Sequence, residues 1–276
     1  MTAYNRQQFI AEAIESVLAT PYENWELIIV DDASKDNTVA IASGYRQQDN
    51  RIKVYVNEKN LGDYPNRNKA ASYAKGKYLV NVDSDDTMFS ENLGKWVDEM
   101  EIHNAEFGIF AKMGNEKPIM LTPEAAIKMH FFEKPILSFG PGATIVKKEY
   151  FDKMKGFPEK YGPANDMYHH VKLAASTNTL FFPFPLINYR LHDSQELNNK
   201  YGYLFNNYNY LKDALTELPL PLTKNEIKFL EKKNKRRFLL NIVQYFFRSF
   251  NFKKSKEAWK KAGFSFSDSI AAIFQL

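Results

Sequence analysis

The chain has 276 residues, of which 44% are hydrophobic and 25% are charged, and its formal net charge is +4. These values are typical of a globular protein and exclude a disordered chain. Cysteine is absent from the sequence, which excludes disulfides, cysteine-ligated metals and thiol catalysis. No apolar stretch reaches the ~20 residues of a membrane-spanning helix, and the N-terminus lacks the apolar core of a signal peptide, so we expect a cytoplasmic protein.

The charge is divided unevenly along the chain. Residues 200–276 contain 15 Lys and Arg against 6 Asp and Glu, a balance of +9, whereas residues 1–199 contain 22 against 27, a balance of −5. The acidic part suits a bound metal ion. The basic end suits phosphate, nucleic acid or an anionic lipid surface.

The first third of the chain alternates between helical and strand patterns. Apolar residues spaced by three and four predict a helix over 6–19, with Asn5 as its N-cap. A continuous apolar run predicts a buried strand at 27–30. Further elements are predicted as a helix at 37–48, an outer strand at 52–56, a helix at 65–75 and a strand at 78–82. This alternation, with a spacing of about 25 residues, predicts parallel βαβ units in an α/β sheet.

The rest of the chain is less regular. We expect helices at 90–103, 147–154 and 166–175, and short strands at 107–110, 143–146 and 186–191. From about 195 the pattern is helical, with one break at 218–221. These patterns predict two parts, a domain of residues 1–195 and a basic helical region of residues 196–276.

Two acidic clusters follow predicted strands. Asp31-Asp32 follows the strand at 27–30, and the cluster Asp83-Ser84-Asp85-Asp86 follows the strand at 78–82. In α/β sheets, ligands bind at the carboxyl ends of the strands. Carboxylates this close repel one another unless a cation or hydrogen bonds offset their charge. The second cluster therefore indicates either a Mg²⁺ or Mn²⁺ site or a solvated turn, and Asp32 either contacts a nucleotide or caps the next helix.

Three further polar features suit a substrate site. Arg67, near the start of a predicted helix, suits a phosphate or base contact, or else a surface ion pair. Asp166 follows a loop that contains glycine and proline residues. A carboxylate at this position indicates either a general base or the N-cap of the next helix. His192, beside Arg190, suits a phosphate contact, although lone residues of these types are more often structural.

Taken in order, these motifs resemble the family 2 glycosyltransferases. The resemblance depends on Tyr4-Asn5, the two acidic clusters, Arg67-Asn68, Asn165-Asp166 and the segment 189–192, and it covers about residues 1–195. It implies the GT-A fold, a Rossmann-like α/β fold with a mixed, mainly parallel sheet flanked by helices, here with a helical C-terminal extension. It also implies an inverting hexosyltransferase that moves sugar from a nucleotide diphosphate, UDP in particular, to a hydroxyl of a glycan or lipid-linked acceptor in cell-surface polysaccharide synthesis.

The resemblance implies a nucleotide site near the first strands. Thr2, Tyr4 and Asp32 are expected to form the pocket for the uracil base. Arg67 is expected to close over the nucleotide, and Asp83 to contact the ribose.

The resemblance also implies which residues take part in the chemistry. Asp85 is expected to bind the divalent cation, Mn²⁺ or Mg²⁺, which stabilises the leaving diphosphate as a Lewis acid. Asp166 is expected to deprotonate the acceptor hydroxyl. His192 is expected to lie on the diphosphate side.

The chain departs from the family pattern in two places. Asn165 stands where the family often has Glu, which bears only on contacts to the acceptor. The chain also begins almost at the Tyr4-Asn5 motif, whereas family members begin with a buried strand. We therefore expect the natural chain to start several residues before Met1.

The basic region contains many aromatic residues. Lys and Arg at 232–237 precede an apolar run at 238–247, and further aromatic and basic residues follow to 259. This mixture is typical of a helix in a membrane interface, which predicts binding of 232–259 to an anionic, cytoplasmic membrane surface. The alternative is a helix docked on the catalytic domain, and nucleic acid is not expected because no nucleic-acid motif accompanies the charge.

Two other functions stay open at this point. A non-catalytic nucleotide-sugar-binding protein would not need Asp85 and Asp166. A sugar-nucleotide pyrophosphorylase would need a Gly-rich, basic phosphate loop at the first strand end, which residues 4–8 do not supply.

Overall fold

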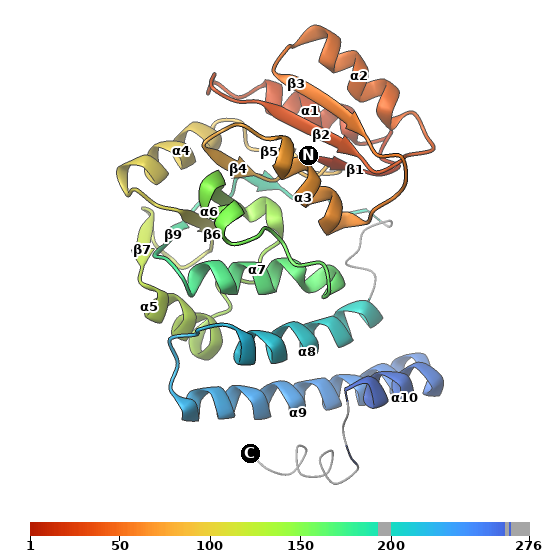
Figure 1. The fold of residues 1–276 in the computed structure, drawn as a ribbon, viewed down its shortest axis with the longest axis vertical. Coiled ribbons are helices and arrows are strands. Elements are labelled where there is room, and N and C mark those ends of the chain that lie inside the picture. Colours follow the sequence, from red (N-terminus) through yellow and green to blue (C-terminus); the bar gives the residue numbers. More distant parts are fainter. Residues whose placement is uncertain (193–199, 263–264, 266–276) are drawn as a thin grey trace.

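Two β-sheets flanked by helices form the body of the molecule, and further helices extend it at the C-terminal end (Figure 1). The computed structural model describes residues 1–192, 200–262 and 265. The first sheet has the order β1-β2-β3 and is parallel throughout. Its strands are β1 (Thr2–Ala3), β2 (Leu27–Asp31) and β3 (Ile52–Val56). This sheet confirms the predicted parallel βαβ start, with β3 at the outer edge. The predicted strand at 78–82 does not join it, because that strand pairs antiparallel in the second sheet.

The second sheet is mixed and has the order β4-β8-β6-β9-β7. Strands β6 and β9 run parallel, and the other neighbours run antiparallel. The strands are β4 (Tyr78–Val80), β6 (Phe107–Phe110), β7 (Ile119–Leu121), β8 (Thr144–Lys147) and β9 (Thr179–Phe182). A separate antiparallel pair joins β5 (Thr87–Met88) to β10 (Ile187–Asn188).

Strand β2 is buried on both faces, as its continuous apolar run predicts. Leu27 and Ile29 join the cluster that contains α1 (Ile10–Leu18) and α2 (Thr38–Gln48). Ile28 and Val30 pack on the other side against Ala70 of α3 (Asp63–Tyr73). Side chains alternate between the faces of a strand, so this run sits between two helical layers.

Asn5 is not the N-cap of α1, so that prediction was wrong. The helix begins at Ile10 with Phe9 at the N-cap position and no side-chain cap. Asn5 instead has a positive φ of 53° and accepts a hydrogen bond of 2.8 Å from the amide of Lys35. The contact of Asn5 with the 31–36 loop outweighs its local preference for capping a helix. This contact turns the chain before α1 starts.

The middle of the chain supplies the helices that cover the second sheet. They are α4 (Asn92–Ile102), α5 (Pro123–Lys128), which continues into a π-helix (Met129–Glu133), α6 (Lys148–Lys153) and α7 (Asn165–Ala174). Two 3₁₀ turns, Pro141–Ala143 and Gly162–Ala164, lie in loops. The largest core cluster joins Phe107 and Phe181 of the sheet to Leu173 of α7. The sequence patterns did not predict β5, β7, β9 or α5, which are all short.

The basic region forms three helices that pack on this body. They are α8 (Lys200–Glu217), α9 (Lys224–Ser249) and α10 (Phe252–Lys261). Helices α7, α8 and α9 follow one another as successive layers, with α8 contacting both α7 and α9 (Figure 1). The break predicted at 218–221 is confirmed, and Thr223 begins α9 with a capping box to Glu226. None of the helices in the described ranges is both long enough and apolar enough to cross a membrane.

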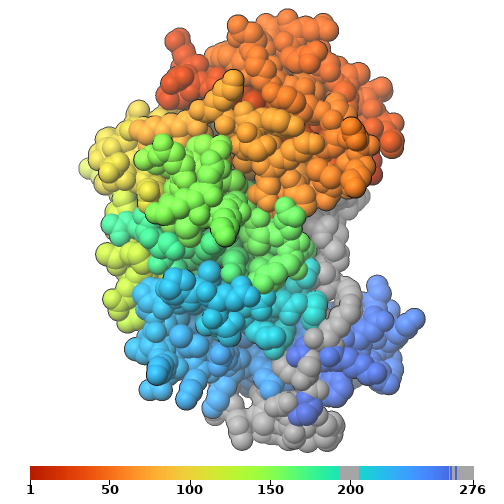
Figure 2. Space-filling view, viewed as in Figure 1, coloured from red at the N-terminus to blue at the C-terminus, as the bar shows by residue number. Residues whose placement is uncertain are grey.

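The surface view shows the same order along the long axis. The N-terminal part forms one end of the molecule, the middle of the chain follows, and the C-terminal helices form the other end (Figure 2). The predicted boundary at 195–196 falls outside the described residues. The C-terminal helices are thus far from the first sheet.

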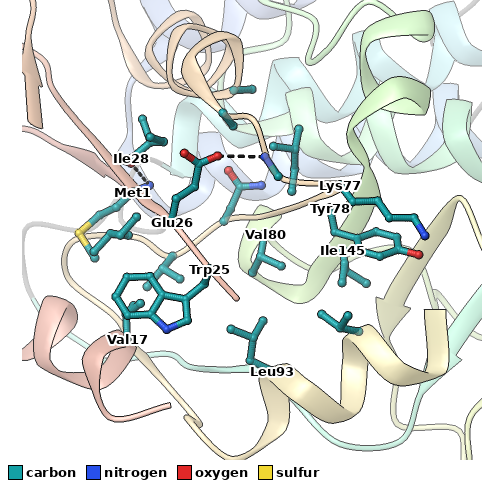
Figure 3. A pocket seen from close by; sticks show the side chains of 18 of the residues that line it. Met1, Val17, Trp25, Glu26, Ile28, Lys77, Tyr78, Val80, Leu93 and Ile145 are labelled. Atoms are coloured by element: carbon teal, nitrogen blue, oxygen red, sulfur yellow. Dashed lines mark hydrogen bonds between the residues drawn. The ribbon is translucent and has the colours of Figure 1, made fainter. Parts of the chain in front are cut away.

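A cavity of about 490 Å³ separates the two sheets near the first strand. Trp25 and Ile28 face Val80, Leu93 and Ile145 across it (Figure 3). The backbone nitrogen of Met1 donates a hydrogen bond of 2.8 Å to the carbonyl of Ile28. The sheets nevertheless share one apolar cluster, which includes Ile29 from the first and Ile145 from the second.

Candidate active site

The pairing of β5 with β10 brings two distant segments together. It places residues 189–192 beside the acidic cluster 83–86. The backbone amide of Arg190 donates to Asp86 Oδ1 at 3.0 Å, and its Nε donates to the carbonyl of Asp85 at 2.6 Å. The same guanidinium also pairs with Glu12 and donates to the carbonyl of Phe9 at 3.2 Å. Arg190 therefore ties the two loops to the start of α1, which is a structural role.

Asp85 and His192 form a direct pair. Nε2 of His192 lies 3.0 Å from Asp85 Oδ2, and the imidazole ring stacks on Phe9 with 4.7 Å between ring centroids. Nε of Arg6 lies 2.8 Å from the same carboxylate oxygen. Two side chains that the sequence analysis selected, 107 residues apart, are therefore brought together.

The pair of Asp85 and His192 fits a divalent cation only in part. Carboxylate and imidazole are both ligands that Mn²⁺ accepts. The described part of the chain contains no group of three or more His, Cys, Asp or Glu arranged to hold a metal. A cation such as Mg²⁺ usually takes one or two carboxylates together with substrate phosphates. The residues thus fit a cation that binds together with a diphosphate.

Arg67 and Asp83 form a second pair, in which the side chain of Arg67 is 7% exposed and that of Asp83 is 23% exposed. Nη1 of Arg67 lies 2.6 Å from Asp83 Oδ1, and its Nε lies 2.8 Å from Asp63. Burial opposes ionisation of Asp83, but the charge and hydrogen bond of Arg67 outweigh it and hold the pKa of Asp83 below its usual value. Asp83 is therefore ionised and fixed before any ligand arrives.

A cavity of about 340 Å³ lies next to this pair. Arg67, Asp83 and Asp166 all line it, together with Tyr64. Its other walls are mainly apolar, and include Phe110, Phe139, Pro141, Ile187 and Tyr189. A concave site with apolar walls and a few convergent polar groups is typical of a substrate pocket.

Asp166 is almost completely buried at the edge of this pocket. Burial raises the pKa of its carboxyl group to about 7, and the amide of Met167 and the charge of Arg67 offset this only partly. The N-cap of α7 is Ala164, without a side-chain cap, so the alternative that Asp166 is the N-cap was wrong. Asn165 accepts a hydrogen bond from the amide of Tyr161 at 2.9 Å and so holds the preceding loop.

Asp32 is buried at the end of β2 and has three donors. Its carboxylate accepts hydrogen bonds from Nδ2 of Asn57 at 2.8 Å and from the amides of Leu61 at 2.8 Å and Gly62 at 2.9 Å. Gly62 is the N-cap residue of α3. The N-cap of the next helix, α2, is Asn37. Asp32 therefore fixes the start of α3, not that of α2 as the capping alternative predicted.

Thr2 and Tyr4 lie close to Asp32 at the end of β1. The amide of Asp32 donates to the carbonyl of Ala3 at 2.8 Å, and Tyr4 is 45% exposed. These three residues do not line the 340 Å³ pocket. The predicted base-binding residues thus form one group, and Arg67, Asp83 and Asp166 form another.

The structure adds residues that the sequence analysis did not select. Arg6 contacts Asp85, and Tyr64 lies in the pocket near Asp166. Both stand next to selected motifs, Arg6 directly after Tyr4-Asn5 and Tyr64 three positions before Arg67. Only their position beside these motifs could have indicated them from the sequence, because the contacts that they make are with residues of distant elements.

The α/β arrangement is that of the GT-A glycosyltransferases. A solved structure of Staphylococcus aureus TarS, residues 1–349 in complex with UDP-GlcNAc, matches with a TM-score of 0.71 at 20% identity and covers 99% of this chain and 80% of that one. The mannosyltransferase PcManGT from Pyrobaculum calidifontis, in complex with GDP-Man and Mn²⁺, matches with a TM-score of 0.65 at 14% identity and covers 98% and 76%. At these identities the match supports the fold, which confirms the predicted fold class.

The profile of the family described as "Glycosyl transferase family 2" matches residues 1–153, and the chain belongs to this family. Among curated proteins, the putative glycosyltransferase EpsE of Bacillus subtilis is 41% identical over 104 residues, which is 37% of each chain. The glucosyltransferase WfgD of Escherichia coli is 37% identical over 107 residues, or 39% of this chain and 42% of WfgD. The matched segments therefore span less than half of these relatives.

Proposed function

We propose that the protein is an inverting glycosyltransferase that moves a sugar from a UDP-sugar to a hydroxyl group of a glycan or lipid-linked acceptor. In this proposal residues 1–195 are the catalytic domain and residues 196–276 are a helical extension. The observation that carries it is the pocket in which Arg67, Asp83 and Asp166 meet, beside the pair of Asp85 and His192. This site combines an ionised carboxylate for the donor, Asp83, with a carboxyl group whose pKa is about 7, Asp166.

We assign the uracil base to Thr2, Tyr4 and Asp32. Oδ2 of Asp32 accepts one hydrogen bond, from the amide of Gly62. A carboxylate oxygen has two lone pairs, so Oδ2 can also accept a hydrogen bond from a further donor such as a base N–H. The ribose is assigned to Asp83, which Arg67 already holds in place. Arg67 has the rigid, planar donors that suit a diphosphate.

The metal ligands are assigned to Asp85 and His192. A bound Mn²⁺ or Mg²⁺ would stabilise the charge of the leaving diphosphate as a Lewis acid. His192 keeps its orientation through the stack on Phe9.

Asp166 is assigned as the base that removes the acceptor proton. A general base works best when its pKa lies near the working pH, and the pKa of Asp166 is about 7. The mainly apolar walls around it exclude water, and Tyr64 and Phe139 offer flat faces to an acceptor sugar. A single displacement from the side opposite the leaving diphosphate inverts the anomeric carbon.

The relatives support a role in cell-surface polysaccharide synthesis. TuaG of Bacillus subtilis, 38% identical over 105 residues, is named a putative teichuronic acid biosynthesis glycosyltransferase. WfgD is named for transfer from UDP-Glc to a diphosphoundecaprenol-linked GlcNAc. By analogy with these relatives, we propose that the present chain also acts in the synthesis of a cell-surface polysaccharide, on a lipid-linked acceptor.

Measurement of sugar transfer distinguishes a glycosyltransferase from a non-catalytic nucleotide-sugar-binding protein and from a pyrophosphorylase. Nucleotide sugars are screened by thermal shift with and without Mn²⁺, since a ligand that binds the folded state raises the melting temperature. The selected donor is then tested for release of UDP on addition of glycan acceptors. Binding without UDP release would identify a binding protein, and formation of UTP from pyrophosphate would identify a pyrophosphorylase.

The variant Asp85→Ala tests the cation. We expect it to lose the metal-dependent part of UDP binding, measured by titration calorimetry with UDP and Mn²⁺. Asp98→Ala, which removes an exposed carboxylate of α4, is the matched control. Metal-dependent affinity that survives Asp85→Ala would exclude Asp85 from the cation site.

Helix α9 supports a membrane-facing role for the extension. One face is buried, with Leu230, Phe238 and Ile242. The opposite face exposes apolar residues at helical spacing, namely Phe229, Leu240, Val243 and Phe247. Exposed Lys232, Lys233 and Arg237 lie among them in sequence. An outward apolar face with basic residues suits an anionic lipid interface.

Vesicle flotation tests this surface. The full chain should float with vesicles that contain anionic lipid and should bind neutral vesicles less. Leu240→Ser with Phe247→Ser should reduce flotation by about tenfold, because each removes apolar area that enters the interface. Ile102→Ser, an exposed apolar residue of α4, is the control. Equal flotation of all variants would reject α9 as the membrane surface.

A further inference from the structure

Arg6 lies against one carboxylate oxygen of Asp85, the residue assigned to the proposed cation. Its Nε lies 2.8 Å from Asp85 Oδ2, and Nε2 of His192 lies 3.0 Å from the same atom. The side chains of Arg6 and Asp85 are 23% and 16% exposed. A pair that is partly shielded from water interacts more strongly than one on the open surface.

The position of Arg6 is fixed by its backbone. Its amide donates to Oγ1 of Thr38 at 2.7 Å. Nη1 of its side chain donates to the carbonyls of Tyr4 and Asn5, each at 3.2 Å, and these two contacts hold the present rotamer. Asn5 turns the chain with its positive φ. The backbone of Arg6 thus keeps its anchor at Thr38 when the side chain changes rotamer, whereas the guanidinium must exchange its present contacts for others.

The charge of Arg6 also explains how the acidic cluster is tolerated without a cation. Asp83 is balanced by Arg67, and Asp86 accepts the amide of Arg190. Arg6 provides the positive charge at Asp85. A guanidinium and a divalent cation cannot both lie against one carboxylate oxygen without strong repulsion.

We propose that Arg6 is a positioning residue that competes with the divalent cation for Asp85 and turns to the diphosphate when nucleotide and cation bind together. The proposal rests on the assignment of the cation to Asp85 in the proposed function. The negative charge of the diphosphate gives the released guanidinium a new partner and offsets its repulsion from the cation. Cation alone therefore binds weakly, and cation and nucleotide each strengthen the binding of the other by the same factor.

The test measures binding of Mn²⁺ alone, by the loss of the free Mn²⁺ signal in electron paramagnetic resonance, with and without UDP. We expect Arg6→Gln to bind Mn²⁺ alone about tenfold more tightly than the wild type, because the competing charge is gone. The factor by which UDP increases Mn²⁺ affinity should become smaller in this variant. Arg6→Lys, which keeps the charge, should stay closer to the wild type.

Arg46→Gln is the matched control, since it removes one positive charge from the exposed surface of α2. Melting curves in the presence of EDTA establish that each variant is folded. If Arg6→Gln binds Mn²⁺ alone no more tightly than the wild type and Arg46→Gln, competition by Arg6 is rejected.

The two proposals fail in different ways. Wild-type protein that binds Mn²⁺ only with UDP, together with an unchanged Arg6→Gln, rejects the role of Arg6 and leaves the cation at Asp85. Protein that binds no Mn²⁺ in any variant, with or without UDP, rejects the cation site itself and the competition with it.

Discussion

Two carboxyl groups that line the pocket, Asp83 and Asp166, lie in opposite electrostatic environments. On the proposed nucleotide side, Asp32 accepts hydrogen bonds from Asn57, Leu61 and Gly62, and Asp83 is paired with Arg67. On the proposed acceptor side, Asp166 is buried among mainly apolar walls, and its pKa rises to about 7. Environment therefore holds the pKa of Asp83 below its usual value, whereas burial raises the pKa of Asp166 and of Asp86, which also lines the pocket, to about 7.

The largest expected effect concerns the acceptor side. Asp166→Asn keeps size and polarity but cannot accept a proton, so we expect transfer to slow by about 10²–10⁴-fold. UDP-sugar affinity should change by no more than a few fold, because the donor contacts lie elsewhere. Steady-state transfer and donor titration measure the two quantities separately.

Asp152→Asn, on the exposed surface of α6, provides the control for this prediction. Transfer by Asp166→Asn at close to the wild-type rate would remove Asp166 as the base. Glu159, whose side chain accepts a hydrogen bond from Asn68 at 3.1 Å, is the next carboxylate to examine.

The second prediction breaks the ion pair on the nucleotide side. Arg67→Met keeps the apolar stem but leaves the partly buried carboxylate of Asp83 without its guanidinium. Loss of one partner of a buried pair costs about 3–5 kcal/mol. We expect the free energy of unfolding, measured by urea denaturation at pH 7, to fall by this amount. A fall below about 1 kcal/mol, as for an exposed pair, would show that the pair is not buried in solution.

The third prediction concerns Asp32. Asp32→Ala should weaken UDP binding in the absence of metal by about 1–3 kcal/mol, since a buried base N–H loses its acceptor. It should also lower stability, because the amides of Leu61 and Gly62 lose theirs. Calorimetry with UDP in EDTA and a melting curve separate the effects. If the variant binds UDP normally but is less stable, Asp32 does not contact the base and serves only to fix the start of α3.

The last prediction is the pH dependence that follows from Asp166. Because its pKa is raised from 3.8 to about 7, the folded protein retains a proton that the unfolded chain has lost. Stability from this group is present at low pH and is lost as pH rises toward about 7. Activity runs the other way, and kcat/KM should fall about tenfold per pH unit below 7. In Asp166→Asn the loss of stability with rising pH should be smaller, and a profile identical to the wild type would exclude this origin.

Local patterns were sufficient for the framework of the fold. The run at 27–30 predicted β2 because both its faces are buried, and the break at 218–221 separated α8 from α9 because its prolines cannot continue a helix. The short strands β5, β7 and β9 were missed. Strands of two to four residues are specified by their partners in the sheet, which lie far away in the sequence.

The sequence by itself determined which residue types stand at the ends of the strands, since the acidic clusters and Asp166 were selected from position and chemistry. It did not decide what each carboxylate does. The tertiary structure placed Arg67 on Asp83, and Arg6 and His192 on Asp85. It also buried Asp166 in a pocket formed by segments more than a hundred residues apart. A side chain's charge state depends on desolvation and nearby charges, and these exist only once distant parts of the chain have come together.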